Sequence, residues 1–233
     1  MYQINDLKQT IGIPFYSNLK CDTLGLDSLE HCFDRNHYKS YPKVTYSFNE
    51  IGFRFKLPTT TTRPILAIGD SFTLGLGVNE EDTWPSELSR ILNIPVLNFS
   101  LNGASNDWMS RKTKTLLEFF DPVAILVHYT FSHRRELPHT DWFDDERTEC
   151  SPIYTEQENF ENWQTNFNFM SSLNLPTVHS FIPGWHTQFV DYTKLPGKVI
   201  SPTKIIDLAR DGFHYGVQTH KELAKQFTNL LDV

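Results

Sequence analysis

Residues 64–72 read Pro64-Ile65-Leu66-Ala67-Ile68-Gly69-Asp70-Ser71-Phe72. The apolar run in this stretch is short and uninterrupted, which is typical of a strand buried on both faces of a sheet. It ends in a small turning segment, and a helix-like stretch follows. That order lifts the Ser71 hydroxyl off the carboxyl edge of the sheet, where open α/β folds place their ligands. The stretch therefore predicts both a fold class and the location of a site.

From residue 64 onward, strand patterns alternate with helix patterns. We expect strands at 64–69, 94–99, 123–129 and 177–182, and helices at 83–93, 106–120, 155–173 and 216–231. Thr83 and Ser105 are the expected N-caps of the first two helices, and residues 133–153 are expected to form a loop. Strands that alternate with helices of this length predict βαβ units. The predicted fold is a three-layer, doubly wound parallel sheet of the flavodoxin-like kind.

The first 60 residues show little periodicity and several turn signals. A short strand is expected at 43–48, and Pro58 with the threonine run 59–62 indicates a connector. We expect residues 1–60 to form an irregular extension packed on a main domain of residues 61–233.

Composition excludes several classes of partner. The 233-residue chain is 39% hydrophobic and 14% aromatic, and its net charge of −7 argues against a nucleic-acid partner. No apolar run approaches the roughly 20 residues that span a bilayer, no basic cluster indicates a membrane anchor, and no leader pattern opens the chain. The three cysteines lack zinc spacing and suit a reducing compartment. We therefore expect a cytoplasmic protein with no metal and no organic cofactor.

The far end of the chain supplies partners for a serine nucleophile. Free serine is a poor nucleophile and needs a base that is itself oriented by a third group. Asp211 and His214 are three residues apart, just before the last predicted helix. In a tight turn, the carboxylate can hold the imidazole while the other ring nitrogen faces Ser71.

Three blocks in this order resemble the SGNH, or GDSL-type, hydrolase family. They are Gly69-Asp70-Ser71-Phe72-Thr73 with Gly75 and Gly77, then Asn98-Phe99-Ser100-Leu101-Asn102-Gly103, then Asp211-Gly212-Phe213-His214. The upstream Phe48-Asn49-Glu50-Ile51-Gly52-Phe53-Arg54 is similar to the lead-in of bacterial and phage members. The resemblance implies the fold of that family. It also implies Ser71 as nucleophile, His214 as general base and then acid, and Asp211 as the group that orients it.

The resemblance further implies an oxyanion hole made by the backbone N–H groups of Ser71 and Gly103 and by an asparagine after the third strand. This chain departs from that pattern, because residues 128–136 contain no asparagine. Thr130 and Ser132 are candidates for the missing donor, and Asn102 and Asn106, both beside the glycine block, are further candidates. Loss of one oxyanion donor typically costs about 10²–10³ in rate.

Other polar residues near these blocks have plainer interpretations. Asp70 is expected to brace the turn by accepting backbone N–H bonds, and Asp207 to brace Arg210. His128 and His133 lack a carboxylate pair at ligand spacing, so structural or substrate-lining roles are favoured over a metal site.

We expect a serine esterase that removes a short acyl group, such as acetyl, from a carbohydrate or small alcohol. Alternatives are acyl transfer to a glycan and a weakly catalytic binding module that keeps the fold. Arg134, which leaves the carboxyl end of a central strand, is expected to line the substrate site. Trp142 and Trp185 lie in loops at the expected site edge and are candidates for a carbohydrate platform.

Overall fold

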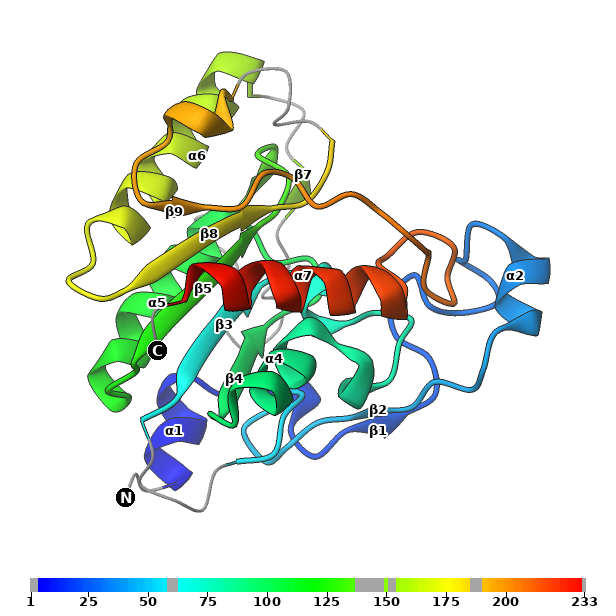
Figure 1. Ribbon diagram of the computed structural model, residues 1–233. Helices are drawn as coiled ribbons and strands as arrows, with labels where there is room; N and C mark the ends of the chain where they lie inside the picture. The colour runs from blue at the N-terminus through cyan, green and yellow to red at the C-terminus, as the bar shows by residue number, and fades with distance from the viewer. Residues whose placement is uncertain (1–3, 58–62, 137–148, 151–153, 185–189, 232–233) are drawn as a thin grey trace.

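The computed structural model describes residues 4–57, 63–136, 149–150, 154–184 and 190–231. Its centre is a five-stranded parallel sheet with the strand order β4-β3-β5-β8-β9 (Figure 1). The strands are β3 (Ile65–Gly69), β4 (Val96–Ser100), β5 (Ala124–Tyr129), β8 (Thr177–Phe181) and β9 (Lys198–Val199). Every residue of β3, β4 and β5 is buried. Burial on both faces explains the uninterrupted apolar run of β3, while β4 and β5 also bury the polar side chains of Asn98, Ser100 and His128.

The chain changes direction across the sheet at β3. Its neighbours are β4 on one side and β5 on the other, and Gly69 pairs in register with Ser100 and His128. The three strands therefore end together at one edge of the sheet. A reversal of strand order at such an edge leaves a crevice, and ligands of open α/β sheets bind there.

Helices cover both faces of the sheet. Trp108 of α5 (Asn106–Phe119) and Trp163 of α6 (Glu156–Ser171) pack on the face that carries Leu66 and Ile68. Trp84 of α4 (Trp84–Leu92) and Phe227 of α7 (Val217–Leu230) lie in the core on the opposite face, with Ile65 and Ala67. The predicted three-layer α/β fold is confirmed (Figure 1).

The predicted N-caps of α4 and α5 are confirmed. The Thr83 hydroxyl accepts a hydrogen bond from the N–H of Ser86, and that of Ser105 accepts one from the N–H of Trp108. These bonds satisfy first-turn donors that the helix itself leaves unpaired.

Short elements are where the sequence prediction was wrong. β9 was not predicted. Within 133–153, β6 (Arg134–Arg135) pairs antiparallel with β7 (Glu149–Cys150), where a loop was expected. The expected strand 43–48 is reduced to β2 (Tyr46–Ser47), which pairs with β1 (Lys20–Cys21). Two-residue strands carry no readable alternation, because their pairing depends on distant partners.

The N-terminal segment contributes to the core. It contains α1 (Ile4–Thr10), a 3-10 helix (Pro14–Tyr16) and α2 (Arg35–Ser40), and Figure 1 shows α2 projecting at one end of the molecule. The Phe53 ring meets Phe99 edge to face at 4.9 Å between centroids. The fully buried Arg54 donates to the carbonyls of Leu74, Gly75 and Val78. The division into 1–60 and 61–233 stays a prediction.

The remaining elements are α3 (Ser71–Leu74) and two 3-10 helices at Glu80–Asp82 and Tyr192–Lys194. In the described part of the chain, none of the helices has the length and apolar character needed to cross a membrane.

Candidate active site

Ser71 lies at the turn between β3 and α3. Asp70 is the N-cap of α3, and its carboxylate accepts the N–H of Phe72 at 3.0 Å. A Cβ atom at Gly69 would lie 2.1 Å from Thr73 Oγ1, so only glycine lets α3 fold back this closely on the strand. The interpretation of Asp70 as a brace for the turn is confirmed.

Asp211 and His214 form a tight loop before α7. Asp211 Oδ1 accepts the backbone N–H groups of Phe213 and His214, both at 3.0 Å. Asp211 Oδ2 lies 2.5 Å from His214 Nδ1. One carboxylate therefore fixes both the loop backbone and the orientation of the imidazole ring.

The structure brings this loop to the serine. His214 Nε2 lies 2.8 Å from Ser71 Oγ, although the two residues are 143 positions apart in the sequence. Ser71 and His214 are each only 2% exposed, and Asp211 is fully buried. Because Nδ1 faces a carboxylate, the hydrogen-bond geometry assigns the proton of the neutral ring to Nδ1, which leaves Nε2 as an acceptor for the hydroxyl.

The carboxylate of Asp211 is held in its charged form. Burial raises the pKa of Asp211, but the hydrogen bond and charge of His214 and two backbone N–H groups outweigh burial, and the net shift is downward. Asp211 is therefore ionised at neutral pH and can stabilise positive charge on the imidazole.

The oxyanion candidates fall into different surroundings. Gly103 has a φ of +80°, and a Cβ atom there would meet no atom within 4 Å, so the space beside it is open. The Asn106 carboxamide is bonded to both backbone groups of Thr130, at 3.1 and 3.3 Å. The Thr130 hydroxyl donates to Asp70 Oδ2 at 2.6 Å. Ser132 Oγ is buried and has no hydrogen-bond partner within the described ranges.

Arg134 is joined to the turn that carries the serine. Its Nη1 donates to Asp70 Oδ2 at 2.7 Å and to Thr130 Oγ1 at 2.8 Å, and its side chain is 17% exposed. The next residue, Arg135, donates instead to the carbonyl of Glu158 on α6. Two adjacent arginines thus serve different parts of the molecule, and the role of Arg134 toward substrate stays a prediction.

The expected contact between Asp207 and Arg210 was wrong. The Asp207 carboxylate accepts the N–H groups of Gln218 and Thr219 in the first turn of α7. Arg210 pairs with Asp27, through Nε to Oδ1 at 2.8 Å and Nη2 to Oδ2 at 2.5 Å. The unpaired N–H groups at the start of α7 bond to the nearby Asp207 carboxylate. The buried Arg210 guanidinium bonds to the Asp27 carboxylate of the N-terminal segment.

The histidines near the third strand pack against neighbouring side chains. His128 is fully buried with its Nδ1 2.8 Å from Ser180 Oγ, and burial lowers its pKa to about 4. His133 is half-buried beside Phe131, and burial lowers its pKa as well. Across the residues that the structure describes, no group of three or more His, Cys, Asp or Glu side chains could hold a metal ion.

Two predicted platform residues, Trp142 and Trp185, lie outside the described residues. The other three tryptophans, Trp84, Trp108 and Trp163, are at most 1% exposed and are packing residues.

The sequence interpretation missed the residues of the N-terminal segment that contact the Asp–His loop. The N–H of Phe33 donates to the carbonyl of Asp211 at 2.9 Å, and His37 Nε2 lies 2.9 Å from the carbonyl of Ala209. Asp34 is an ordinary N-cap for α2, and that pattern is visible in the sequence. Nothing in the sequence indicates a partner about 180 residues away.

No family model and no curated protein matches the chain. Solved structures do share its fold. An acetyl xylan esterase, Est2A, from the rumen bacterium Butyrivibrio proteoclasticus is 13% identical with a TM-score of 0.51, over 75% of this chain and 64% of that one. TesA is 12% identical with a TM-score of 0.51, over 73% of this chain and 98% of that one.

A family 2 carbohydrate esterase with a carbohydrate-binding domain, from Corynascus thermopiles (Myceliophthora fergusii), is 13% identical with a TM-score of 0.50. The match covers 79% of this chain and 69% of that one. At these identities the similarity is one of fold. The chain has the fold of the SGNH, or GDSL-type, hydrolases, as the resemblance implied.

Proposed function

We propose that this protein is a serine esterase, with Ser71 as nucleophile, His214 as general base and acid, and Asp211 as the orienting carboxylate. The observation that carries the proposal is the buried chain of two hydrogen bonds, 2.8 Å from Ser71 to His214 and 2.5 Å from His214 to Asp211. Such a chain provides a base within reach of the nucleophile and a third group that fixes the ring.

The reaction proceeds through an acyl-enzyme. Ser71 Oγ attacks the ester carbonyl while His214 Nε2 takes the hydroxyl proton, and the ionised Asp211 stabilises the imidazolium. The N–H groups of Ser71 and Gly103 stabilise the oxyanion. His214 then gives the proton to the leaving alcohol, and it activates a water molecule that releases the acid from Ser71. This sequence needs no metal and no organic cofactor.

The absence of the family's asparagine bears on the oxyanion hole. The hydroxyl of Thr130 and the carboxamide of Asn106 already serve other bonds, which leaves the two backbone donors as the core of the hole. Ser132 and Asn102 are the remaining side-chain candidates, and the Ser132 hydroxyl has no partner within the described ranges. We propose Arg134 as a substrate-lining cation beside the nucleophile turn.

The proposed substrate is a short acyl ester, such as an acetyl ester, of a carbohydrate or small alcohol. Two structures of the same fold are named as an acetyl xylan esterase and a carbohydrate esterase, which supports a sugar ester here.

The test is hydrolysis of 4-nitrophenyl acetate, butyrate and octanoate and of acetylated xylose by the purified protein. We expect activity on the acetyl esters, and a loss of about 10⁴-fold or more in Ser71→Ala and His214→Ala. Ser110→Ala is the matched control, because the Ser110 hydroxyl lies on α5 and has no hydrogen-bond partner among the described residues. Full activity of Ser71→Ala would overturn the proposal.

A further inference from the structure

An unbroken series of aromatic contacts leads from His214 to the surface. The Phe213 ring meets the His214 ring edge to face, at 5.0 Å between centroids and an interplanar angle of 89°. The Phe33 ring stacks on Phe213, at 4.9 Å and 15°. Phe72, which follows Ser71, closes the series from the inner side, 4.5 Å from His214 and 5.6 Å from Phe213.

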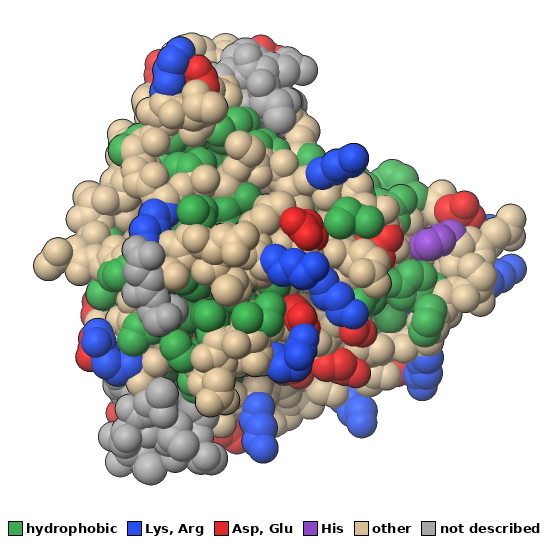
Figure 2. All heavy atoms as spheres, viewed as in Figure 1, with side chains coloured by type: hydrophobic (Ala, Val, Ile, Leu, Met, Phe, Trp, Pro, Cys, Tyr) green, Lys and Arg blue, Asp and Glu red, His purple; other side chains and the backbone are tan. Residues whose placement is uncertain are grey.

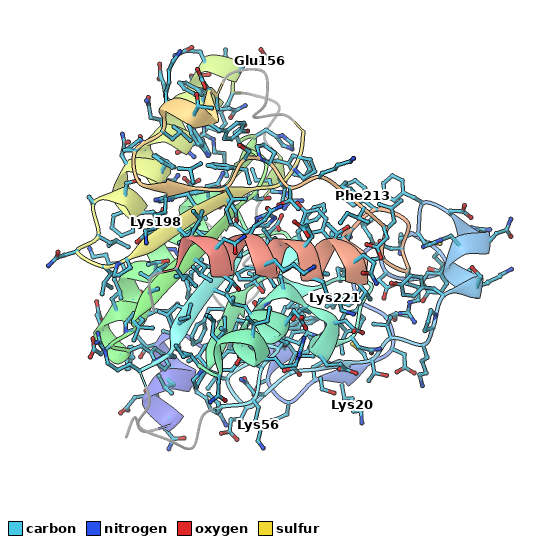
Figure 3. All side chains as sticks on the ribbon, viewed as in Figure 1. Lys20, Lys56, Glu156, Lys198, Phe213 and Lys221 are labelled. Carbon is cyan, nitrogen blue, oxygen red and sulfur yellow. The ribbon has the colours of Figure 1, made fainter. Side chains whose placement is uncertain are left out.

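Exposure rises steeply along this series. Phe72 is buried, Phe213 is partly buried, and Phe33 is 65% exposed. Figure 3 shows Phe213 on the loop before α7, on the side that faces α2. In Figure 2, hydrophobic side chains gather on the same side, between α7 and α2. Phe33 therefore presents an exposed aromatic ring beside the loop that carries His214.

The position of Phe33 is fixed relative to His214. Its N–H bonds to the carbonyl of Asp211 at 2.9 Å, so the backbone of Phe33 is tied to the loop itself. A Cβ atom at Gly212 would lie 3.4 Å from the N atom of Asp34, so the two backbones are in close contact. The His37 ring bonds to Ala209 on the same loop. The stacking surface is therefore preorganised, which lowers the entropic cost of binding to it.

The chemistry of the proposed function says which part of the ester this surface meets. The acyl carbonyl lies toward the oxyanion donors, Ser71 and Gly103. The alcohol oxygen must lie near His214 Nε2, which gives it a proton as it leaves. The alcohol portion therefore lies on the His214 side of the serine, where Phe213 contacts the His214 ring and Phe33 extends the aromatic series outward.

We propose that Phe33 and Phe213 form a stacking surface for the alcohol portion of the ester, and that this portion is a ring with a flat apolar face, such as a pyranose. This inference rests on the proposed function and extends it, because it assigns a substrate class and a specificity residue on the N-terminal segment. Aromatic side chains offer a large rigid contact area at low entropic cost, which suits them to contact the flat face of a ring.

The test compares esters that share an acetyl group and differ in the alcohol. The substrates are ethyl acetate, phenyl acetate and a monoacetylated methyl β-xylopyranoside. Phe33→Ala is expected to lower kcat/KM about 3–10-fold for the two ring alcohols, through KM, and to leave ethyl acetate within about twofold. Phe33→Trp is expected to keep the kcat/KM of the parent for the two esters with ring alcohols.

Phe15→Ala is the matched control. Phe15 is 77% exposed and also belongs to the N-terminal segment, where it contacts Tyr16 rather than the Asp–His loop. This variant is expected to leave kcat/KM unchanged for all three substrates. A uniform effect of Phe33→Ala on all three esters, or no effect, would overturn the inference. Full activity of Ser71→Ala would instead overturn the proposed function.

Binding gives a second readout that does not depend on turnover. NMR titration with methyl β-xylopyranoside is expected to shift signals of the parent protein and of Phe15→Ala, with at least threefold weaker binding to Phe33→Ala. Equal binding to Phe33→Ala, or no binding to the parent, would contradict the stacking surface.

Discussion

The two halves of the candidate site are held in place in different ways. Ser71 is held locally, by a strand buried in the middle of the sheet, the Asp70 cap and the close return of α3 at Gly69. Asp211 and His214 are held at long range, by a loop whose outer side is bonded to residues 27–37. The nucleophile thus depends on the sheet, and the base depends on the N-terminal segment.

This difference identifies where the site can be weakened without touching a reacting group. Asp27 is fully buried and receives two bonds from Arg210, next to Asp211, and one from the Tyr46 hydroxyl at 2.5 Å. Tyr46 in turn accepts the N–H of Gly77, in the segment after α3. One carboxylate of the N-terminal segment therefore connects both halves.

The largest effect is expected from breaking this connection. Asp27→Asn removes the charge that balances the buried Arg210, which typically costs about 3–5 kcal/mol. We expect a matching loss in the free energy of unfolding and a fall of about tenfold in kcat, with KM little changed, at temperatures where the variant is folded. Denaturant unfolding and steady-state kinetics measure the two effects.

Asp22→Asn is the control for this prediction. Asp22 is an exposed partner of Lys43, at 2.9 Å, on the same segment. Exposed pairs are screened by solvent and contribute little to stability, so this variant should behave like the parent. If both variants have the same stability and activity, the N-terminal segment does not position the base.

A smaller effect is expected on the nucleophile half. Arg134→Gln removes the cation that bonds to Asp70 and Thr130, and kcat/KM should fall about tenfold. The thermal midpoint should fall as well, because the fully buried Asp70 carboxylate loses its cation. Arg135→Gln removes the neighbouring cation, which bonds to Glu158 and Asn159. It should lower the thermal midpoint and leave kcat/KM within about twofold. If kcat/KM fell more in Arg135→Gln than in Arg134→Gln, Arg134 would not belong to the site.

Much of this arrangement could be predicted from the sequence. The buried strand 64–69, the turn at Ser71 and the Asp211–His214 spacing are local patterns, and the structure places them as the patterns indicate. The connection through Asp27 could not be predicted, because an aspartate in an irregular segment carries no signal of its partner 183 residues later. Arg210 was assigned to Asp207 for the same reason, since only the nearby carboxylate was visible. Phe33 was missed because a single exposed aromatic residue has no periodicity.

The last effect is absent at neutral pH and concerns acid stability. Burial lowers the pKa values of His128 and His179 to about 4 and that of His220 to about 3. In the unfolded chain a histidine titrates near 6.5, so the unfolded state binds more protons between these values. The stability contributed by the neutral rings is complete above about pH 6.5 and is lost as the pH falls toward about 4. The thermal midpoint should decrease across that window.

His220→Asn tests this pH dependence close to the general base. The His220 ring lies 5.9 Å from the ring of Tyr215, the residue next to His214. Asparagine can still accept the N–H of Trp84, which lies 3.1 Å from His220 Nδ1, but it does not titrate. As the pH falls through this window, the free energy of unfolding should decrease by about 1.4 kcal/mol less per pH unit than in the parent. His31→Asn, at an exposed position, is the matched control for the substitution itself. An unaltered slope in His220→Asn would contradict the buried neutral ring.

The most direct test of the central claim, that His214 and Asp211 activate Ser71, is reaction with a fluorophosphonate ester followed by mass spectrometry of the intact protein and its peptides. The account predicts one adduct per chain on the peptide that contains Ser71, none in Ser71→Ala, and much slower labelling in His214→Ala. A folded parent that takes up no label, or an adduct on another residue, would contradict it.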